Sequence, residues 1–131
     1  MQPTIQCSPG WNKYQDRCIL FLTSTMNWAN CRQHCLSYGA RMVCVDSETT
    51  NNFITNQLSS SHYIWIGLND LAVEMQFVWE YPACTATFRK WVSGRPSNNQ
   101  NLNCGSSYNY VWDDHDCSHL HNCVCEINPS L

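Results

Sequence analysis

The sequence predicts an α+β domain in which two short helices lie among antiparallel strands and disulfide bonds hold the chain together. Two segments with helical spacing, residues 25–38 and 48–58, are separated and followed by short apolar runs typical of strands. Ten cysteines in 131 residues indicate folding in an oxidising compartment, because cytosolic thiols rarely reach this density. A chain of this length supports one core, so we expect residues 1–131 to form a single, secreted domain.

The N-terminal part predicts a hairpin followed by a buried strand. Residues 7–22 read CSPGWNKYQDRCILFL, in which Gly10 and the polar run at 12–17 suit a turn and residues 19–22 suit a strand. From residue 25 the apolar residues recur at helical spacing, and Gly39 is expected to end this first helix. The residues that recur at helical spacing are Trp28, Cys31, Cys35 and Tyr38.

A second helix is expected at residues 48–58. Ser47 caps its start, because a serine hydroxyl can accept a hydrogen bond from a free amide of the first turn. Between the two helices, residues 40–45 (ARMVCV) suit a short apolar strand. The stripe of this helix that we expect to face the core is Phe53, Ile54 and Leu58.

Residues 63–68 (YIWIGL) form an unbroken apolar run between polar clusters, which predicts a central strand buried on both faces. Further strands are expected at residues 77–80 and 122–127. Between residues 82 and 103 the chain is rich in Asn, Ser, Gly and Pro and has no regular pattern, which predicts a long irregular loop. Loops of this length in compact domains usually carry function.

Three motifs together resemble those of the C-type lectin family. Trp65-Ile66-Gly67-Leu68 matches its core strand, Arg95-Pro96-Ser97 stands at its carboxylate-proline-amide triplet, and Trp112-Asp113-Asp114 stands at its Trp-Asn-Asp triplet. The resemblance covers residues 7–127 and includes the N-terminal hairpin of the long form of the domain. It implies a C-type lectin-like fold and carbohydrate binding.

The resemblance also implies three disulfides: Cys7–Cys18, Cys35–Cys125 and Cys104–Cys117. It leaves four cysteines unassigned: Cys31, Cys44, Cys84 and Cys123. Cys31 lies one helical turn before Cys35, and Cys123 shares a strand face with Cys125, so Cys31–Cys123 is the pairing we favour. Cys84, in an irregular segment, is a candidate for a bridge to a second chain. Zinc is the alternative to disulfides, but the sequence has no Cys-x-x-Cys pair.

In this family, side chains around the long loop hold a calcium ion, and the ion holds the sugar. Carried over to this sequence, one glutamate of the set becomes Arg95, the asparagine after proline becomes Ser97, and an acidic residue becomes Leu102. Asp113 and Asp114 stand where the family has asparagine and aspartate. Calcium takes six to eight oxygen ligands, and a guanidinium stays charged at any usable pH. We therefore expect no calcium and no other cofactor.

Arg95 has two interpretations. It is either a solvated surface charge or a substitute for the ion, pairing with Asp113 or Asp114 through two parallel hydrogen bonds. In the second case side chains alone recognise the sugar, and an acetamido group offers a donor, an acceptor and a methyl for selectivity. The residues expected to contact the sugar are Arg95, Ser97, Asn98, Asn99, Tyr108, Tyr110, Asp113, Asp114 and His115.

The motif at Arg95 resembles that of marine-invertebrate (bivalve-type) lectins with Arg-Pro-Asp or Lys-Pro-Asp, which are understood to bind N-acetylhexosamines without calcium. Ser97 departs from their aspartate. We therefore expect binding of GalNAc or GlcNAc, with a homo- or heterodimer raising a weak affinity enough for agglutination or microbial recognition. The alternatives are a lectin-like domain that binds a protein partner without sugar activity, and calcium-dependent binding of galactose or mannose.

Other functions are disfavoured. A net charge of −3 argues against nucleic acid, and no apolar run approaches the ~20 residues of a membrane helix. The adjacent carboxylates of Asp113 and Asp114 point to opposite faces of an extended chain, which does not suit glycoside hydrolysis, so we expect no enzyme. The histidines at positions 115, 119 and 121, with aspartates nearby, leave zinc open, although such clusters are usually solvated polar loops.

Overall fold

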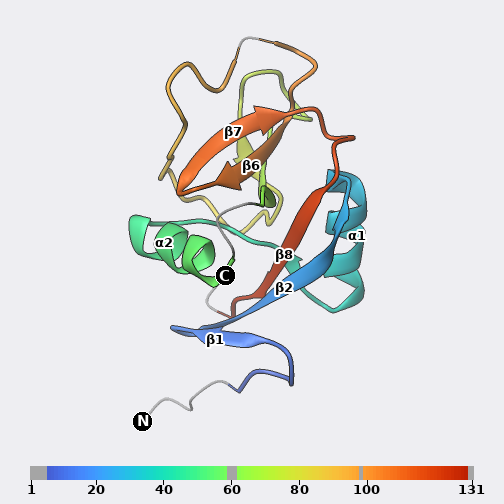
Figure 1. Cartoon of the computed structure of the whole chain (residues 1–131), viewed down its shortest axis with the longest axis vertical. Coiled ribbons are helices and arrows are strands. Elements are labelled where there is room, and N and C mark those ends of the chain that lie inside the picture. The colour runs from blue at the N-terminus through green and yellow to red at the C-terminus, as the bar shows by residue number, and fades with distance from the viewer. Residues whose placement is uncertain (1–5, 59–61, 98, 130–131) are drawn as a thin grey trace.

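The computed structural model describes residues 6–58, 62–97 and 99–129. Two helices in this part of the chain, α1 (Trp28–Ser37) and α2 (Glu48–Gln57), are set among strands, so the predicted α+β class is confirmed (Figure 1). The strands are β1 (Asn12–Tyr14), β2 (Arg17–Met26), β3 (Arg41–Met42), β4 (Ile64–Asn69), β5 (Val78–Trp79), β6 (Cys104–Tyr108), β7 (Val111–His115) and β8 (His121–Ile127).

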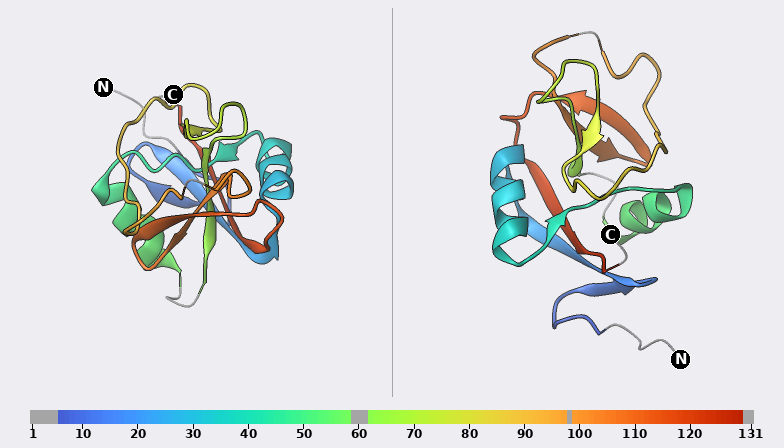
Figure 2. Two further views of the ribbon diagram at one scale, coloured as in Figure 1. Left: turned by 90° about the horizontal axis from the view of Figure 1, so that it is seen from above. Right: turned by 180° about the vertical axis from the view of Figure 1, so that it is seen from behind.

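The strands form one sheet in the order β1-β2-β8-β4-β6-β7, with β3 added to β8 and β5 to β4. β4 and β8 pair in parallel, so the sheet is mixed and not purely antiparallel as expected. The two helices flank the β2–β8 ribbon on opposite sides (Figures 1 and 2). The β6–β7 hairpin and the long loop that follows β5 lie together at the end of the molecule opposite β1 (Figure 1). This end carries the candidate site.

β4 is the buried centre of the sheet, as predicted: all of its residues are buried. The indole N–H of Trp65 donates to the carbonyl of Met26 at 2.8 Å, so its burial leaves no unpaired donor. A Cβ at Gly67 would lie 3.1 Å from the carbonyl oxygen of Val43, which explains why this position of the strand needs a glycine.

α1 begins three residues later than expected, because β2 continues to Met26 in its pairing with β8. The side chain of Asn27 caps the helix by accepting a backbone N–H of the first turn at 2.8 Å. Gly39 follows the helix with a φ of +70°, the left-handed conformation expected of a helix stop. The buried face consists of Trp28, Cys31 and Cys35, whereas Tyr38 is exposed.

α2 begins after Ser47, whose hydroxyl accepts the backbone N–H of Thr50 as predicted. It ends one residue before the expected end. Its buried stripe differs from the prediction, since Thr50 and Asn51 are buried with Ile54, while Phe53 and Leu58 are only partly buried. The polar residues are buried because they have partners: the indole of Trp112, for example, donates to Asn51 at 2.8 Å.

The strand expected at residues 40–45 is reduced to the two residues of β3. The chain then crosses from β8 to β4, because the N–H of Val43 donates to Val124 and its carbonyl accepts from Gly67. Backbone bonds to β7 hold the long loop at residues 90–92: the N–H of Trp112 donates to Lys90 and its carbonyl accepts from Val92, each at 2.8 Å.

All ten cysteines are paired within the chain. The three bridges implied by the resemblance are present, and so is Cys31–Cys123, which joins α1 to β8 beside Cys35–Cys125. The expectation that Cys84 reaches a second chain is wrong, because Cys84 is only 6% exposed and is bonded to Cys44. The irregular backbone around it indicated exposure, but its side chain packs inward on the core.

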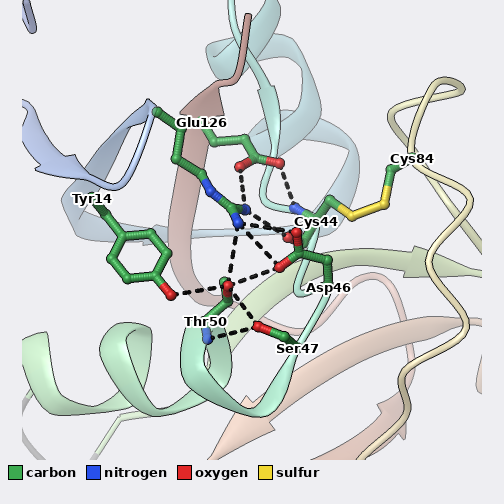
Figure 3. A network of polar contacts seen from close by, with 8 residues as sticks. Tyr14, Cys44, Asp46, Ser47, Thr50, Cys84 and Glu126 are labelled. Carbon is green, nitrogen blue, oxygen red and sulfur yellow. Dashed lines mark hydrogen bonds and ion pairs between the residues drawn. A yellow bond between two sulfur atoms is a disulfide. The ribbon is translucent and has the colours of Figure 1, made fainter. Parts of the chain in front are cut away.

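A buried ion pair connects the two long strands beside α2 (Figure 3). Arg17 donates to Glu126 at 3.1 Å and to both carboxylate oxygens of Asp46, at 3.0 and 3.1 Å. Burial raises the pKa of Glu126, whose side chain is 0% exposed, while the N–H of Cys44 and the guanidinium of Arg17 oppose this rise. Arg17 remains charged, because the two carboxylates outweigh the burial that lowers its pKa.

Candidate functional site

The part of the long loop that contains Arg95 and Ser97 lies against the end of β7. The Arg95–Pro96 peptide bond is cis. The guanidinium of Arg95 reaches both aspartates of β7, with Nε 3.1 Å from Oδ1 of Asp113 and Nη1 3.1 Å from Oδ1 of Asp114. Arg95 and Asp113 are partly exposed, at 34% and 22% of their side chains, whereas Asp114 is 0% exposed.

Asp114 is the anchor of this segment. Its Oδ1 accepts from Arg95, and its Oδ2 accepts both the backbone N–H of Ser97 at 2.8 Å and the hydroxyl of Ser97 at 2.9 Å. Three donors therefore compensate the burial of one carboxylate. The prediction that Arg95 pairs with the aspartates is confirmed, although it grips one oxygen of each residue and not both oxygens of one.

Asp113 is held less completely. Its Oδ1 lies within ion-pair distance of Arg95 but accepts no hydrogen bond from the described residues, because the N–H direction is unfavourable. Its Oδ2 lies 3.4 Å from Nε2 of His115. Because Oδ1 is buried, a ligand could reach the carboxylate of the partly exposed Asp113 only at Oδ2.

The residues at this position do not fit a calcium ion. Calcium needs oxygen ligands at about 2.3–2.6 Å, and the guanidinium nitrogens of Arg95 already lie beside the oxygens that Asp113 and Asp114 would offer. At ~4 Å and an effective dielectric of 20, a guanidinium repels a divalent ion by about 8 kcal/mol. Leu102, at a position where the family supplies an acidic ligand, adds no oxygen.

His115 connects Asp113 to a group of aromatic side chains. Its Nδ1 lies 3.0 Å from the hydroxyl of Ser106 and 3.0 Å from Nε2 of His121. Burial lowers the pKa of His115, with the carboxylate of Asp113 opposing the change. Burial, followed by the charges of His115 and His119, lowers the pKa of His121 to about 4. Both rings are therefore neutral at pH 7.

The two tyrosines of the predicted set lie in different places. Tyr108 stacks on Tyr63 with ring centroids 4.6 Å apart, and Tyr63 lies 5.0 Å from the ring of His115, so Tyr108 is connected to the site through Tyr63. Tyr110 lies at the β6–β7 turn, where its hydroxyl donates to Asn56 of α2. Four residues of strand, about 13 Å, separate it from Asp114, so Tyr110 does not border the site formed by Arg95.

The remaining predicted residues are the two asparagines of the loop. Asn99 is exposed, and its side-chain oxygen accepts the backbone N–H of Asn101 at 2.9 Å. Asn98 lies outside the described residues. The structure therefore brings together Arg95, Ser97, Asp113, Asp114 and His115, whereas Tyr108 is linked to them through Tyr63 and Asn99 contacts Asn101 within the loop.

Three residues near the site were not among the predicted sugar contacts. Tyr63 was assigned to the apolar strand, Ser106 had no distinguishing motif, and His121 was considered only as a candidate zinc ligand. They meet His115 because β6 pairs with β7 and because β8 starts beside β4, in a parallel pairing of residues 58 positions apart. The alternation of β6 could have placed Ser106 on the face of Asp113, once the hairpin register was known.

The fold, its five disulfides and the loop beside the paired aspartates define a lectin-like domain of the C-type architecture. A family model described as "Lectin C-type domain" matches residues 24–127, and the chain belongs to this family. No helix among the described residues has the length and apolar character that a membrane span requires.

Known proteins of the family are similar over most of the chain. Lectin BRA-3 of Megabalanus rosa is 33% identical over 95% of this chain and 82% of its own. The carbohydrate-recognition domain of cow CD23, solved in the presence of a GlcNAc2Man3 oligosaccharide, is 28% identical with a TM-score of 0.86, covering 96% of this chain and 98% of its own. A calcium-independent type II antifreeze protein shares the fold alone, with 20% identity, a TM-score of 0.89 and coverage of 98% of both chains.

Proposed function

We propose that this protein is a secreted, non-catalytic lectin that binds N-acetylhexosamines, GalNAc or GlcNAc, without calcium. The observation that carries the proposal is the guanidinium of Arg95, which lies 3.1 Å from an oxygen of each aspartate at the metal position of the family. Membership of the C-type lectin family and the relative solved in the presence of an oligosaccharide support carbohydrate as the ligand class. Five disulfides support an oxidising, extracellular location.

The contacts divide the predicted residues into two roles. Ser97 and Asp114 hold each other, and Asp114 is fully buried, so we assign to them the positioning of the loop. The side chain of Arg95 is partly exposed as a donor, and Oδ2 of Asp113 is the carboxylate oxygen that remains as an acceptor, because Oδ1 is buried. The carbonyl of an acetamido group suits the donor of Arg95, and its N–H suits the acceptor of Asp113.

Selectivity for acetamido sugars follows from the protein groups that another sugar would leave without a hydrogen-bond partner. A sugar without the acetamido group would cover Arg95 and Asp113 without satisfying them, and an unmet buried polar group costs about 1–3 kcal/mol. That penalty corresponds to roughly 5- to 150-fold in affinity. The exposed amide of Asn99 and the ring of Tyr108 suit the hydroxyls and the apolar face of the pyranose.

The test is chromatography on resins that carry GalNAc, GlcNAc or galactose, loaded and washed in EDTA. We expect retention on one of the acetamido resins and elution by the free sugar. Retention that disappears in EDTA would support calcium-dependent binding instead. Passage through all three resins, with and without calcium, would support the protein-partner alternative and overturn the proposal.

A matched pair of variants tests the role of Arg95. Arg95→Gln removes the cation between the aspartates and is expected to abolish retention, and Arg95→Glu is expected to do the same through repulsion. Lys90→Gln removes an exposed cation whose partner is Glu48 of α2, and it should leave retention unchanged. Circular dichroism of each variant separates loss of binding from loss of fold. Unchanged retention of folded Arg95→Gln would make Arg95 a mere surface charge.

A further inference from the structure

We propose that His115, His119 and His121 form a binding site for a divalent transition-metal ion of the zinc and copper class. The three side chains each offer one nitrogen, and these atoms all lie within 4.8 Å of one another. The site is separate from the position of calcium in the family, which Arg95 takes. It shares His115 with the proposed sugar site, but metal binding makes no use of the acetamido group and does not depend on sugar binding.

The nitrogen positions are close to those that zinc requires. Nδ1 of His115 and Nε2 of His121 are 3.0 Å apart. Two nitrogens that bind a tetrahedral zinc ion at 2.0–2.1 Å lie about 3.4 Å apart, so the existing contact needs to open by only about 0.4 Å. The ring of His119 lies 5.6 and 5.9 Å from the other two rings, and its exposed side chain is free to turn toward the ion.

The backbone that carries the three histidines is held in place. His115 ends β7 opposite Cys104, and His121 begins β8 opposite Met26. Between them, the N–H of His119 closes a turn onto the carbonyl of Asp116 at 3.1 Å. The disulfide Cys104–Cys117 ties this turn to the start of β6. A metal ion would therefore find three ligands on fixed elements, and binding costs little ordering.

The surroundings of the three rings are those of a metal centre. Oδ2 of Asp113 lies 3.4 Å from Nε2 of His115, so with the proton on Nε2 the lone pair of Nδ1 faces His121. A carboxylate behind a ligating histidine fixes its tautomer and raises its basicity. Asp113 also stands between the cluster and Arg95, and its charge offsets that of the guanidinium.

Aromatic rings line the other side of the cluster. The ring of His121 lies 4.4 Å from that of Trp65 and 5.3 Å from that of Tyr63. Such a wall shields part of His115 and His121 from water and strengthens the charge–dipole interactions of an ion. The exposed side of His119 leaves the fourth position of a tetrahedral ion open to water or to a small ligand.

Imidazole nitrogens select the metal. They suit zinc, copper and nickel, whereas calcium and magnesium prefer oxygen ligands. Among the divalent ions, copper is expected to bind more tightly than zinc, following the general order of affinities for nitrogen sites. The proposal thus combines a lectin-like domain that does not use calcium with a nitrogen site for a different class of ion.

Calorimetric titration of zinc chloride into the chelator-treated, disulfide-intact chain tests the proposal. We expect one saturable site per chain that excess calcium chloride does not compete for. His119→Ala should weaken zinc by 10-fold or more, and cobalt(II) should give the strong visible absorption of tetrahedral nitrogen coordination. His34→Ala, which removes an exposed histidine from α1, is the control and should bind zinc as the parent chain does.

Two results would overturn the inference: no zinc binding, or equal binding by the parent chain and His119→Ala. Because His119 is exposed, its substitution is not expected to disturb folding, and a thermal melt of the variant checks this. The titration contains no sugar, so its outcome is independent of the resin experiments. A chain that binds GalNAc and not zinc would refute the metal site alone, and the converse would refute the sugar proposal alone.

Discussion

The disulfide Cys31–Cys123 should contribute less stability than its loop length suggests. It spans 92 residues, and its neighbour Cys35–Cys125 spans 90. In the chain-entropy model, a loop of this length is worth about 4.6 kcal/mol. Once Cys35–Cys125 has formed, however, Cys31–Cys123 closes a ring of only about 8 residues, drawn from one turn of α1 and a short piece of β8, and the same model gives about 2.5 kcal/mol for it.

Cys44–Cys84 provides the comparison. It spans only 40 residues, but no other bridge runs beside it, and the model gives about 3.9 kcal/mol for such a loop. All four cysteines of the two bridges are buried, so the loss of sulfur packing is similar in both cases. We therefore expect the double alanine variant of Cys31 and Cys123 to lose about 1.4 kcal/mol less than that of Cys44 and Cys84.

Equilibrium unfolding in urea, without reductant, measures both free energies and the m-values that show whether the unfolded state has expanded. Removal of both bridges between α1 and β8 should cost about 7 kcal/mol, which exceeds the sum of the two separate losses. The reasoning is refuted if loss of Cys31–Cys123 costs as much as loss of Cys44–Cys84, because the shared ring would then have no effect.

Three further predictions concern the ion pair, the central strand and calcium. Arg17→Met leaves the buried carboxylate of Glu126 without its cation and should lower the unfolding free energy in urea by about 3–5 kcal/mol. Lys90→Met, at an exposed ion pair, should lower it by less than about 1 kcal/mol. Similar losses for the two variants would contradict the burial of the first pair. Gly67→Ala places a Cβ 3.1 Å from the carbonyl oxygen of Val43 and should lower the unfolding free energy by about 1–3 kcal/mol. A neutral result in urea unfolding would show that the two segments move apart easily. Calcium chloride in excess should leave the melting temperature of the parent chain unchanged, and a rise that EDTA reverses would show a calcium site.

Features that depend on neighbours in the chain could be predicted from the sequence. The apolar run of β4 and the cap at Ser47 are examples, because strand burial patterns and helix capping act over a few residues. The bridge Cys31–Cys123 was predicted from one helical and one extended spacing, but only beside Cys35–Cys125, which the family resemblance supplied. The ends of the first helix could not be placed in this way, because the pairing of β2 with β8 decides where it begins.

Features that depend on distant partners could not be predicted. Thr50 and Asn51 are polar residues of α2, and only contacts such as the indole of Trp112 make their burial favourable. Cys84 shows the same effect, since an irregular backbone indicated exposure while its side chain packs on the core. In each case a contact across the fold outweighs the local preference of the residue.

The amino-acid sequence by itself determined the class of fold, the family and the presence of a cation beside two aspartates, because these follow from local patterns and from the order of motifs. Only the tertiary structure decided that Arg95 divides its fork between Asp113 and Asp114, and that Ser97 completes the shell of the buried one. It also decided that His121 meets His115, through the register of strands that are far apart in the chain. The physical reason is that hydrogen bonds and ion pairs depend on distances of a few tenths of an ångström, which packing sets and sequence spacing does not.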